Sequence, residues 1–583
     1  MDRPFTTYVT AGTLLSELQT TEGRAIAVAR LRENGFYRAV LESYRGGLVV
    51  DEALLRDVRD FFVRQGFDTL GGLMPVWGAG FGKPGQGIEV RGPFFCYSAH
   101  ETVAALDAEI RKLARLFDQV VVDDGFLTAC RCPLCQAGRG KRDWFSFRRD
   151  LLCTVARRWV AAARDENPKV RVTVKFPQYY DRYHRFGYDA ERFPKIFDAV
   201  WVGTETRDPD TLDYGHVEPY QGYFNTRWMR ACAGAKFECG WFDYLDCDEQ
   251  LFYEQAVTTS LGTPQDITIF CYGREVFSGG KMARLVQAVP MLTRLRDIAT
   301  VPRGVHVLKP PNSDGREDLF LFDYLGMLGV PCVPVTRLEP AMRSVFVPAH
   351  GMSDPDTPKL IADILGSGGT VAITFNALEQ MLSAPDFLDL FGYDGSGVVS
   401  AVVRPEWFQL GGERLTSRCP VRLAGDLAPS DAAVLVSAGL EGCERGILTI
   451  PVATVKTHPS GGKALVWNLG TFGHNAFQVN EQLNVPVATH WFSLPKPVLD
   501  ALRSTLTEPL GFHIAVPPRV ACFLFARHLV AVNYTSNFCE VRTKGLRLSA
   551  GNLLTDSGNT TCAGNDLFLA PRCFAAVECV APF

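Results

Sequence analysis

The feature that most constrains the fold of this chain is a regular alternation of apolar runs and amphipathic segments in its first 300 residues. Eight runs have the length and the β-branched content of buried strands. They are Thr6–Ala11, Tyr37–Tyr44, Thr69–Trp77, Gln119–Asp124, Arg171–Pro177, Ala199–Thr204, Lys236–Phe242 and Asp266–Tyr272. Segments with helical periodicity, such as Glu22–Glu33 and Trp144–Ala163, separate them. This alternation predicts an α/β fold, a (β/α)8 TIM barrel over residues 1–300.

A doubly wound parallel sheet is the alternative to the barrel. Dinucleotide-binding sheets of that kind carry a Gly-x-Gly-x-x-Gly turn after their first strand. No such turn follows Thr6–Ala11, so the barrel is the preferred prediction.

The remaining chain predicts two further domains. Strand-like runs at Gly304–Leu308, Ser344–Pro348 and Thr370–Phe375, with helical segments between them, indicate a flavodoxin- or amidotransferase-like α/β domain over residues 301–394. It lacks a cysteine at the strand-to-helix turn near His350, which argues against glutaminase chemistry. Residues 395–583 are rich in short β-like runs with Gly, Asn and Asp between them, which is typical of β-sandwich modules.

Charge and hydropathy exclude several classes of function. The net charge is −4, and no run of Lys or Arg supplies a surface for phosphates, so we expect no nucleic-acid partner. No apolar stretch approaches the roughly 20 residues that span a bilayer, and residues 1–5 do not resemble a signal peptide. We therefore expect a cytoplasmic protein without a membrane segment.

Charged and aromatic residues gather at the carboxyl ends of the predicted barrel strands, where barrel enzymes hold their active sites. Aromatic faces stack on sugar rings and carboxylates accept hydrogen bonds from hydroxyl groups, so this set predicts a carbohydrate substrate. The candidates for substrate binding are Glu42, Tyr44, Arg45, Trp77, Lys175, Tyr180, Arg207 and Trp241, and Arg274 and Glu275 follow the eighth strand.

Three cysteines, Cys130, Cys132 and Cys135, follow the fourth predicted strand in a Cys-x-Cys-x-x-Cys pattern. Structural zinc ions usually have four ligands. Cys96 lies in the loop after the third strand, which neighbours this loop in a barrel. We therefore predict a structural Zn²⁺ bound by these four cysteines, and most of the other cysteines as buried free thiols.

The pair Asp123-Asp124, the cysteine triplet and the aromatic, basic segment that follows resemble the β-galactosidases of glycoside hydrolase family 42 and related clan A barrel glycosidases. The resemblance implies a trimer, with the α/β domain at the subunit contacts. It also implies that Asp124 is the acid/base residue and that Asp123 takes the place of an asparagine. In that family the nucleophile follows the seventh strand, a position held here by Asp243.

Glycoside hydrolysis uses two carboxyl groups. Because neighbouring like charges raise one partner's pKa, Asp123 offers a way to keep one of the pair protonated. Asp243 is the first candidate for the second carboxylate, and Glu205, close to Arg207 in sequence, is its rival. The alternative interpretation of Glu205 is a salt bridge with Arg207 or Lys175. The predicted function is an exo-acting glycosidase for short oligosaccharides. The alternative is a non-hydrolytic glycan-binding or assembly protein, because the Asp-Asp pair departs from the family's pattern.

Overall fold

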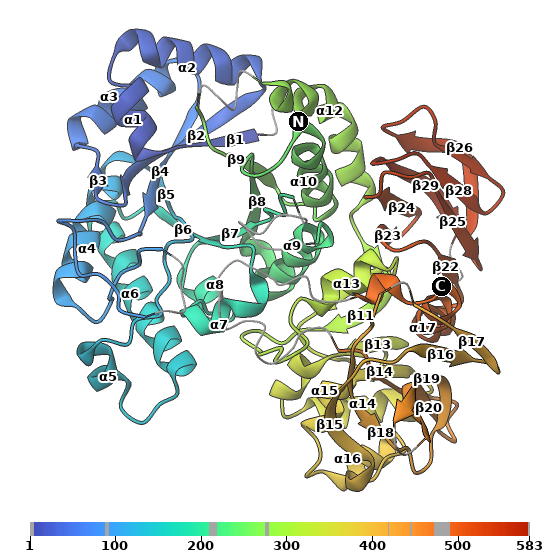
Figure 1. The fold of residues 1–583 in the computed structure, drawn as a ribbon. Helices are drawn as coiled ribbons and strands as arrows, with labels where there is room; N and C mark the ends of the chain where they lie inside the picture. The colour runs from blue at the N-terminus through green and yellow to red at the C-terminus, as the bar shows by residue number, and fades with distance from the viewer. Residues whose placement is uncertain are drawn as a thin grey trace. The chain divides into compact units, whose positions relative to one another are not determined.

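The computed structural model describes residues 5–87, 92–208, 218–273, 279–417, 419–443, 446–470 and 490–580. Within these ranges the chain forms two compact units that divide between Arg296 and Asp297. Each unit is described by itself below, and Figure 1 labels the elements.

The first unit is a closed barrel of eight parallel strands, as the sequence predicts. The strands are β1 (Phe5–Val9), β2 (Phe36–Arg45), β4 (Asp68–Met74), β5 (Gln119–Val122), β6 (Arg171–Phe176), β7 (Ala199–Gly203), β8 (Phe237–Asp243) and β9 (Asp266–Phe270). The barrel closes because β1 pairs in parallel with both β2 and β9. A short strand, β3 (Leu48–Val49), pairs antiparallel with the end of β2.

Helices surround these strands (Figure 1). They are α1 (Ala11–Glu17), α2 (Thr21–Glu33), α3 (Glu52–Arg64), α4 (His100–Leu116), α5 (Pro133–Arg139), α6 (Trp144–Glu166), α7 (Tyr183–Phe186), α8 (Phe193–Ile196), α9 (Tyr220–Ala233), α10 (Glu249–Leu261) and α12 (Gly280–Ile298). The sequence explains α3 locally. Asp51 caps it by accepting a hydrogen bond from the Leu54 backbone N–H at 2.8 Å, and Leu55, Val58 and Phe62 form its buried face.

Large side chains fill the barrel interior. Tyr8, Trp201 and Trp241 pack there with Val40, Leu70, Val121 and Cys239. The rings of Tyr8 and Trp241 lie 5.0 Å apart. Because alternate residues of a strand point to opposite faces, the inward positions form a packed core rather than a channel. This core is the floor below the strand ends.

The second unit begins with a parallel sheet whose strand order is β12-β11-β13-β14-β21. In chain order this is the 2-1-3-4-5 arrangement of flavodoxin-like sheets. Its strands are β11 (Val305–Leu308), β12 (Cys332–Val335), β13 (Ser344–Val347), β14 (Thr370–Thr374) and β21 (Lys463–Trp467). The helices around it are α13 (Leu321–Met327), α14 (Thr357–Gly366), α15 (Phe375–Glu379) and α16 (Pro385–Leu390).

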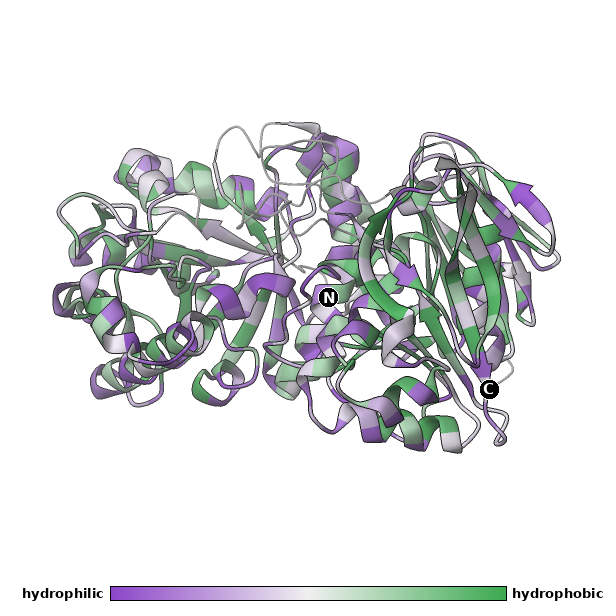
Figure 2. Cartoon of the chain, turned by 60° about the horizontal axis from the view of Figure 1, so that its bottom comes forward, coloured by the Kyte–Doolittle hydropathy of each residue, from purple (hydrophilic) through white to green (hydrophobic). Residues whose placement is uncertain are grey.

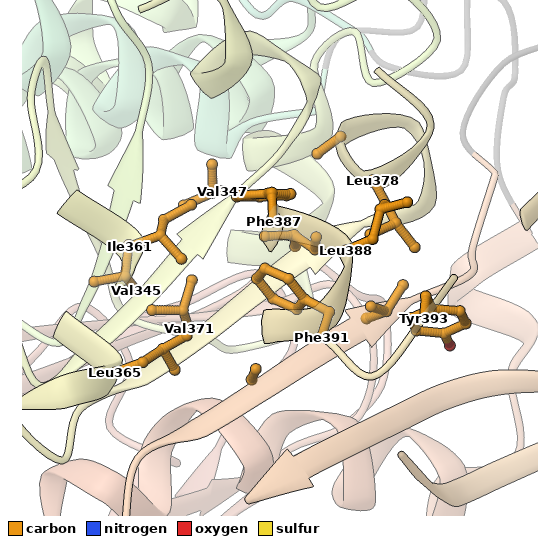
Figure 3. Close-up of a cluster of buried hydrophobic side chains, with 14 of the residues drawn as sticks. Val345, Val347, Ile361, Leu365, Val371, Leu378, Phe387, Leu388, Phe391 and Tyr393 are labelled. Atoms are coloured by element: carbon orange, nitrogen blue, oxygen red, sulfur yellow. The ribbon is translucent and has the colours of Figure 1, made fainter. Parts of the chain in front are cut away.

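The sheet does not end at residue 394, where the sequence predicts a boundary. β21 pairs in parallel with β14, and the same sheet continues antiparallel through β20 (Gly446–Thr457), β19 (Ala433–Cys443), β16 (Trp407–Leu410) and β17 (Glu413–Leu415). Ala464 and Val466 of β21 share one hydrophobic core with Val345 and Val371, part of which Figure 3 shows. Two further strands, β15 (Val398–Val403) and β18 (Leu423–Leu427), pair with each other.

The last part of the second unit contains two antiparallel sheets around one core, in agreement with the predicted β-sandwich. One sheet has the order β10-β23-β24-β29-β26 and the other β22-β25-β28-β27. Their strands are β10 (Pro302–Arg303), β22 (His513–Ala515), β23 (Val520–Phe525), β24 (His528–Asn533), β25 (Cys539–Lys544), β26 (Arg547–Thr555), β27 (Thr561–Ala563), β28 (Asp566–Leu569) and β29 (Phe574–Val580), with α17 (Lys496–Thr507) before them. β23 is buried at every position and its residues are apolar throughout. Figure 2, coloured by hydropathy, shows long hydrophobic stretches in strands near the C-terminus.

No helix in the described ranges is long and apolar enough to cross a membrane.

Candidate active site

The carboxyl ends of five barrel strands, four of them consecutive from β5 to β8, bring the predicted site residues together. Arg45 ends β2, Asp123 and Asp124 follow β5, Lys175 lies in β6, Glu205 and Arg207 follow β7, and Asp243 ends β8. The predicted residues Arg274 and Glu275 lie outside the described residues.

Lys175 is the centre of this arrangement. Its Nζ atom donates hydrogen bonds to Asp124 Oδ2 at 2.6 Å and to Glu205 Oε1 at 2.9 Å. Asp123 Oδ1 lies 3.6 Å from the same nitrogen. The ammonium group stands over the Trp241 ring, 4.5 Å from its centre. Three carboxylates from two strand ends therefore share one buried cation.

Asp123 is buried and tightly bound. Its Oδ1 accepts a hydrogen bond from the Asp124 backbone N–H at 2.7 Å, and its Oδ2 lies 3.3 Å from Arg45 Nη2. Burial raises the pKa of Asp123 to about 6, and the charge of Asp124 adds to this rise, whereas Lys175 and Arg45 oppose it. Asp123 can therefore hold a proton at mildly acidic to near-neutral pH.

Glu205 is also buried, and only one of its oxygens is held. Oε1 accepts the hydrogen bond from Lys175, whereas Oε2 is buried without a hydrogen-bond partner among the described residues. Burial raises the pKa of Glu205 to about 7; Lys175 and Arg207 lower it, and Asp243 and Asp124 raise it. Glu205 is thus a second group in this site that titrates near neutral pH.

Asp243 is held by a bidentate ion pair. Arg207 donates from Nε to Oδ1 at 3.0 Å and from Nη2 to Oδ2 at 2.5 Å. The Leu245 backbone N–H donates to Oδ1 at 3.1 Å. Paired N–H donors favour the ionised carboxylate and fix its orientation.

The hydrogen bonds to Lys175 limit how far apart two of the candidate catalytic groups lie. Because Asp124 Oδ2 and Glu205 Oε1 both bind Lys175 Nζ, these two oxygens are at most about 5.5 Å apart. Retaining glycosidases place their two carboxyl groups about 5–5.5 Å apart, and inverting enzymes place them about 6.5–9.5 Å apart. The upper limit on the distance between these two oxygens lies below the separation typical of inverting enzymes.

Several predicted substrate-binding residues have structural partners. The Glu42 carboxylate is fully buried and accepts hydrogen bonds from Tyr8 Oη at 2.7 Å and from the Ala11 backbone N–H at 2.6 Å. Tyr44 donates to the Val76 carbonyl and stacks on Phe81 with ring centres 4.1 Å apart. For both residues a contact with substrate stays a prediction.

Three other predicted binding residues differ in exposure. Tyr180 is buried against Phe224, with ring centres 4.9 Å apart. Trp241 belongs to the barrel core, and Trp77 is half-buried after β4. Of these three, Trp77 retains the exposure that stacking on a sugar ring requires.

Two residues that the sequence did not single out support the site. Tyr188 donates its hydroxyl hydrogen to the Asp124 carbonyl oxygen. Gln255 of α10 donates to the Asp243 carbonyl at 2.9 Å and accepts from the Thr206 backbone N–H at 3.1 Å. The sequence does not signal either role, because Tyr188 lies 64 residues after Asp124 and Gln255 lies in the helix that follows β8.

The four predicted cysteine ligands converge beside the catalytic loops. Cys96 lies in the loop after β4, Cys130 and Cys132 in the loop after β5, and Cys135 in α5. All four are buried, and their sulfur atoms lie within 4.8 Å of one another. The Cys96 sulfur is 3.5 Å from that of Cys132 and 3.7 Å from that of Cys135.

These distances fit a tetrahedral metal ion. Zinc–sulfur bonds of about 2.3 Å place the sulfurs of a regular tetrahedron about 3.8 Å apart. The Gln86 backbone N–H also donates to Cys130 Sγ at 3.3 Å, a contact that stabilises a thiolate. The donor set therefore fits one metal ion bound by four cysteines.

A closed parallel barrel with several carboxylates at the carboxyl ends of its strands has these groups where barrel enzymes hold their active sites. Residues 2–285 match the family model described as "Probable glycosyl hydrolase, catalytic domain". The barrel of this chain thus matches a glycosyl hydrolase catalytic domain, which agrees with the resemblance seen in the sequence.

Individual relatives are distant in sequence. "Uncharacterized protein SSO3021" of Saccharolobus solfataricus is 22% identical over 418 residues, an alignment that covers 64% of this chain and 66% of that protein. This chain thus spans about two thirds of the length of that relative.

Solved structures share the fold. The β-galactosidase of Bacillus circulans sp. alkalophilus has a TM-score of 0.64 at 12% identity, covering 100% of this chain and 99% of its own. The β-galactosidase of Rahnella sp. R3 has a TM-score of 0.63 at 12% identity, covering 99% and 98%. An exo-β-1,4-mannosidase of Opitutaceae bacterium strain TAV5 has a TM-score of 0.53 at 12% identity, covering 80% and 92%. At these identities the likeness concerns the fold.

Proposed function

We propose that this protein is an exo-acting glycosidase that hydrolyses short oligosaccharides or simple glycosides. The observation that carries this proposal is the group of carboxylates around Lys175 at the carboxyl ends of a glycosyl hydrolase barrel. β-Galactosides and β-mannosides are the first substrates to test, because structures with the same fold are named for these activities.

Asp124 is the proposed acid/base residue. Its side chain is 24% exposed, whereas those of Asp123, Glu205 and Asp243 are each 4% exposed. Among these four carboxylates, Asp124 can therefore reach the oxygen of a bound glycoside most easily. Asp123 binds the Asp124 backbone N–H and shares Lys175 with it, so it orients and electrostatically supports its neighbour.

Asp243 is the proposed second carboxylate, and Glu205 is its rival. Arg207 binds both oxygens of Asp243 and so fixes the orientation of this carboxylate. Glu205 is favoured by its spacing from Asp124 and by its unengaged Oε2 atom. In a retaining reaction, Asp124 donates a proton to the glycosidic oxygen while the second carboxylate forms an ester with the anomeric carbon. Asp124 then removes a proton from the water that cleaves the ester.

The first test is hydrolysis of a panel of aryl glycosides by the wild-type protein and by Asp124→Asn. The amide cannot exchange the proton, so we expect kcat to fall by about 100-fold or more while the protein stays folded. Near-normal rates would remove Asp124 from the mechanism. Binding of sugars without turnover by the wild-type protein would favour the glycan-binding alternative.

Glu205→Gln and Asp243→Asn, assayed with added azide, separate the two rivals. Azide replaces a missing nucleophile and gives a glycosyl azide of inverted configuration. We expect this product from Asp243→Asn and not from Glu205→Gln. The opposite result would assign Glu205 as the nucleophile.

The proposal extends to a structural zinc ion, a homotrimer and a cytoplasmic location. The tetrahedral spacing of the cysteine sulfurs supports zinc. The resemblance to glycoside hydrolase family 42 supports the trimer. The cysteines that the structure describes are free thiols, which supports a reducing compartment.

A further inference from the structure

The burial of Lys175 and its bonds to carboxylates argue against direct contact between its side chain and a substrate. Its side chain is 2% exposed and lies against Trp241 of the barrel core. An ammonium group has three N–H donors. Asp124 and Glu205 each accept one, and Asp123 lies 3.6 Å away. Two of the three donors are therefore used, and the burial of the side chain leaves little room for a sugar hydroxyl beside the third.

We propose that Lys175 is a positioning residue, whose ammonium group holds Asp124, the proposed acid/base residue, and Glu205 at a fixed spacing and balances the negative charge of these two carboxylates. The inference rests on the proposed glycosidase function and assigns to Lys175 a role other than substrate binding.

The strand order explains why a lysine at this position can hold both groups. β6, which contains Lys175, pairs with β5 on one side and β7 on the other. Asp124 follows β5, and Glu205 follows β7. The lysine thus stands on the strand between the two carboxylates. Without it, two acidic groups at most about 5.5 Å apart would repel each other in a poorly solvated site.

Two arginines near the site form ion pairs with carboxylates other than Asp124 and Glu205. Arg45 of β2 pairs with Glu42 at 2.9 Å and with Asp123 at 3.3 Å. Arg207, after β7, binds both oxygens of Asp243 of β8. Lys175 is the cation in direct contact with both Asp124 and Glu205.

The electrostatics agree with this role. Burial raises the pKa of Asp123 to about 6 and that of Glu205 to about 7, and Lys175 lowers both. Burial by itself would lower the pKa of Lys175, but Asp124, Glu205 and Asp123 together raise it well above its usual value. Lys175 therefore stays charged while these carboxyl groups titrate.

The first test compares wild-type protein with Lys175→Met, which removes the charge and keeps most of the volume. We expect kcat to fall by about 100-fold and the acidic limb of the kcat/KM profile to move upward by about one pH unit. We expect KM to change by less than about threefold. A raised KM with an unmoved acidic limb and an unchanged kcat would show a substrate-binding lysine and overturn the proposal.

The second test needs no substrate, so it stands even if the wild-type protein hydrolyses no glycoside. A carboxyl group whose folded-state pKa is raised makes the folded state less stable as pH rises through that pKa. Lys175→Met removes a charge that lowers the pKa values of Asp123 and Glu205, so it raises these two pKa values further. We therefore expect the variant's unfolding midpoint to lie close to that of the wild type at pH 5 and well below it at pH 8. An equal gap at both pH values would contradict the inference.

Lys175→Arg provides the matched variant that keeps the positive charge and changes the geometry. We expect its acidic limb to stay near that of the wild type while kcat falls, because the larger guanidinium alters the spacing. Should Lys175→Met fail to fold at either pH, Lys175→Arg decides by itself. A normal kcat, or a raised KM at unchanged kcat, would then overturn the proposal.

Discussion

At the residue scale, the site depends on close contacts that a single atom would disturb. A Cβ added at Gly203 would lie 2.3 Å from Glu205 Oε2 and 2.8 Å from the Gln178 backbone nitrogen. Gly203 ends β7, immediately before the segment that carries Glu205 and Arg207. The absence of a side chain there allows Glu205 to turn back toward Lys175.

Gly203→Ala should therefore displace Glu205 and lower both stability and activity. Overpacking of this kind costs about 1–3 kcal/mol, and we expect a fall in kcat larger than that loss of stability alone would cause. Urea unfolding and steady-state kinetics measure the two effects. Gly366→Ala is the matched control, since nothing lies within 4 Å of its added Cβ. An unchanged kcat for Gly203→Ala would show that Glu205 does not need this position.

Residue-scale chemistry was predictable only in part. The Asp123-Asp124 pair and its place at a strand end follow from the sequence, because an apolar run ending in acidic residues is visible in one dimension. A salt bridge of Glu205 with Arg207 or Lys175 was an alternative interpretation of the sequence. The sequence could not choose between these two partners, because 30 residues separate Lys175 from Glu205. The sequence named Lys175 as a site residue but assigned it to substrate.

At the scale of elements, the four clustered cysteines link two consecutive strand–helix connections of the barrel. Cys96 comes from the connection after β4, and the other three cysteines come from the connection after β5. Gly125 and Asp124 lie at the start of the second connection. A metal ion at this place would hold the loop that carries the acid/base residue.

Cys96→Ser should lower the zinc content of the purified protein and its stability. A metal that binds the folded state stabilises it by about 4 kcal/mol when free zinc exceeds the dissociation constant a thousandfold. Metal analysis and thermal unfolding, each with and without a chelator, measure the loss. Cys419→Ser is the control because Cys419 is an exposed free thiol. Equal zinc content and equal midpoints for Cys96→Ser and wild type would contradict the metal site.

At the scale of the whole molecule, one sheet of the second unit extends beyond the domain boundary that the sequence predicts at residue 394. Residues 395–470 look β-rich, which led to a predicted boundary at residue 394. In the structure β21 completes the parallel sheet after a long excursion through antiparallel strands. Pairing between β14 and β21 joins segments about 90 residues apart, and no local pattern predicts such pairing.

Val466→Ala on β21 and Val345→Ala on β13 should therefore destabilise the same unfolding transition. Both side chains are buried in one core, and each truncation is expected to cost about 2 kcal/mol. Differential scanning calorimetry of the full chain measures which transition moves. Val402→Ala, at an exposed position of β15, is the control and should move none. Shifts in two separate transitions would restore the boundary at residue 394.

The sequence by itself determined the barrel, the eight strands, the cysteine set and the aspartate pair, because periodicity and local spacing encode these features directly. It also indicated the glycosidase class through the residues around Asp124. Only the tertiary structure decided that Lys175 joins carboxylates of neighbouring strands, that Arg207 holds Asp243, and that β21 closes the second sheet. The physical reason is that these contacts form between segments distant in the chain, where burial and charge depend on the completed fold.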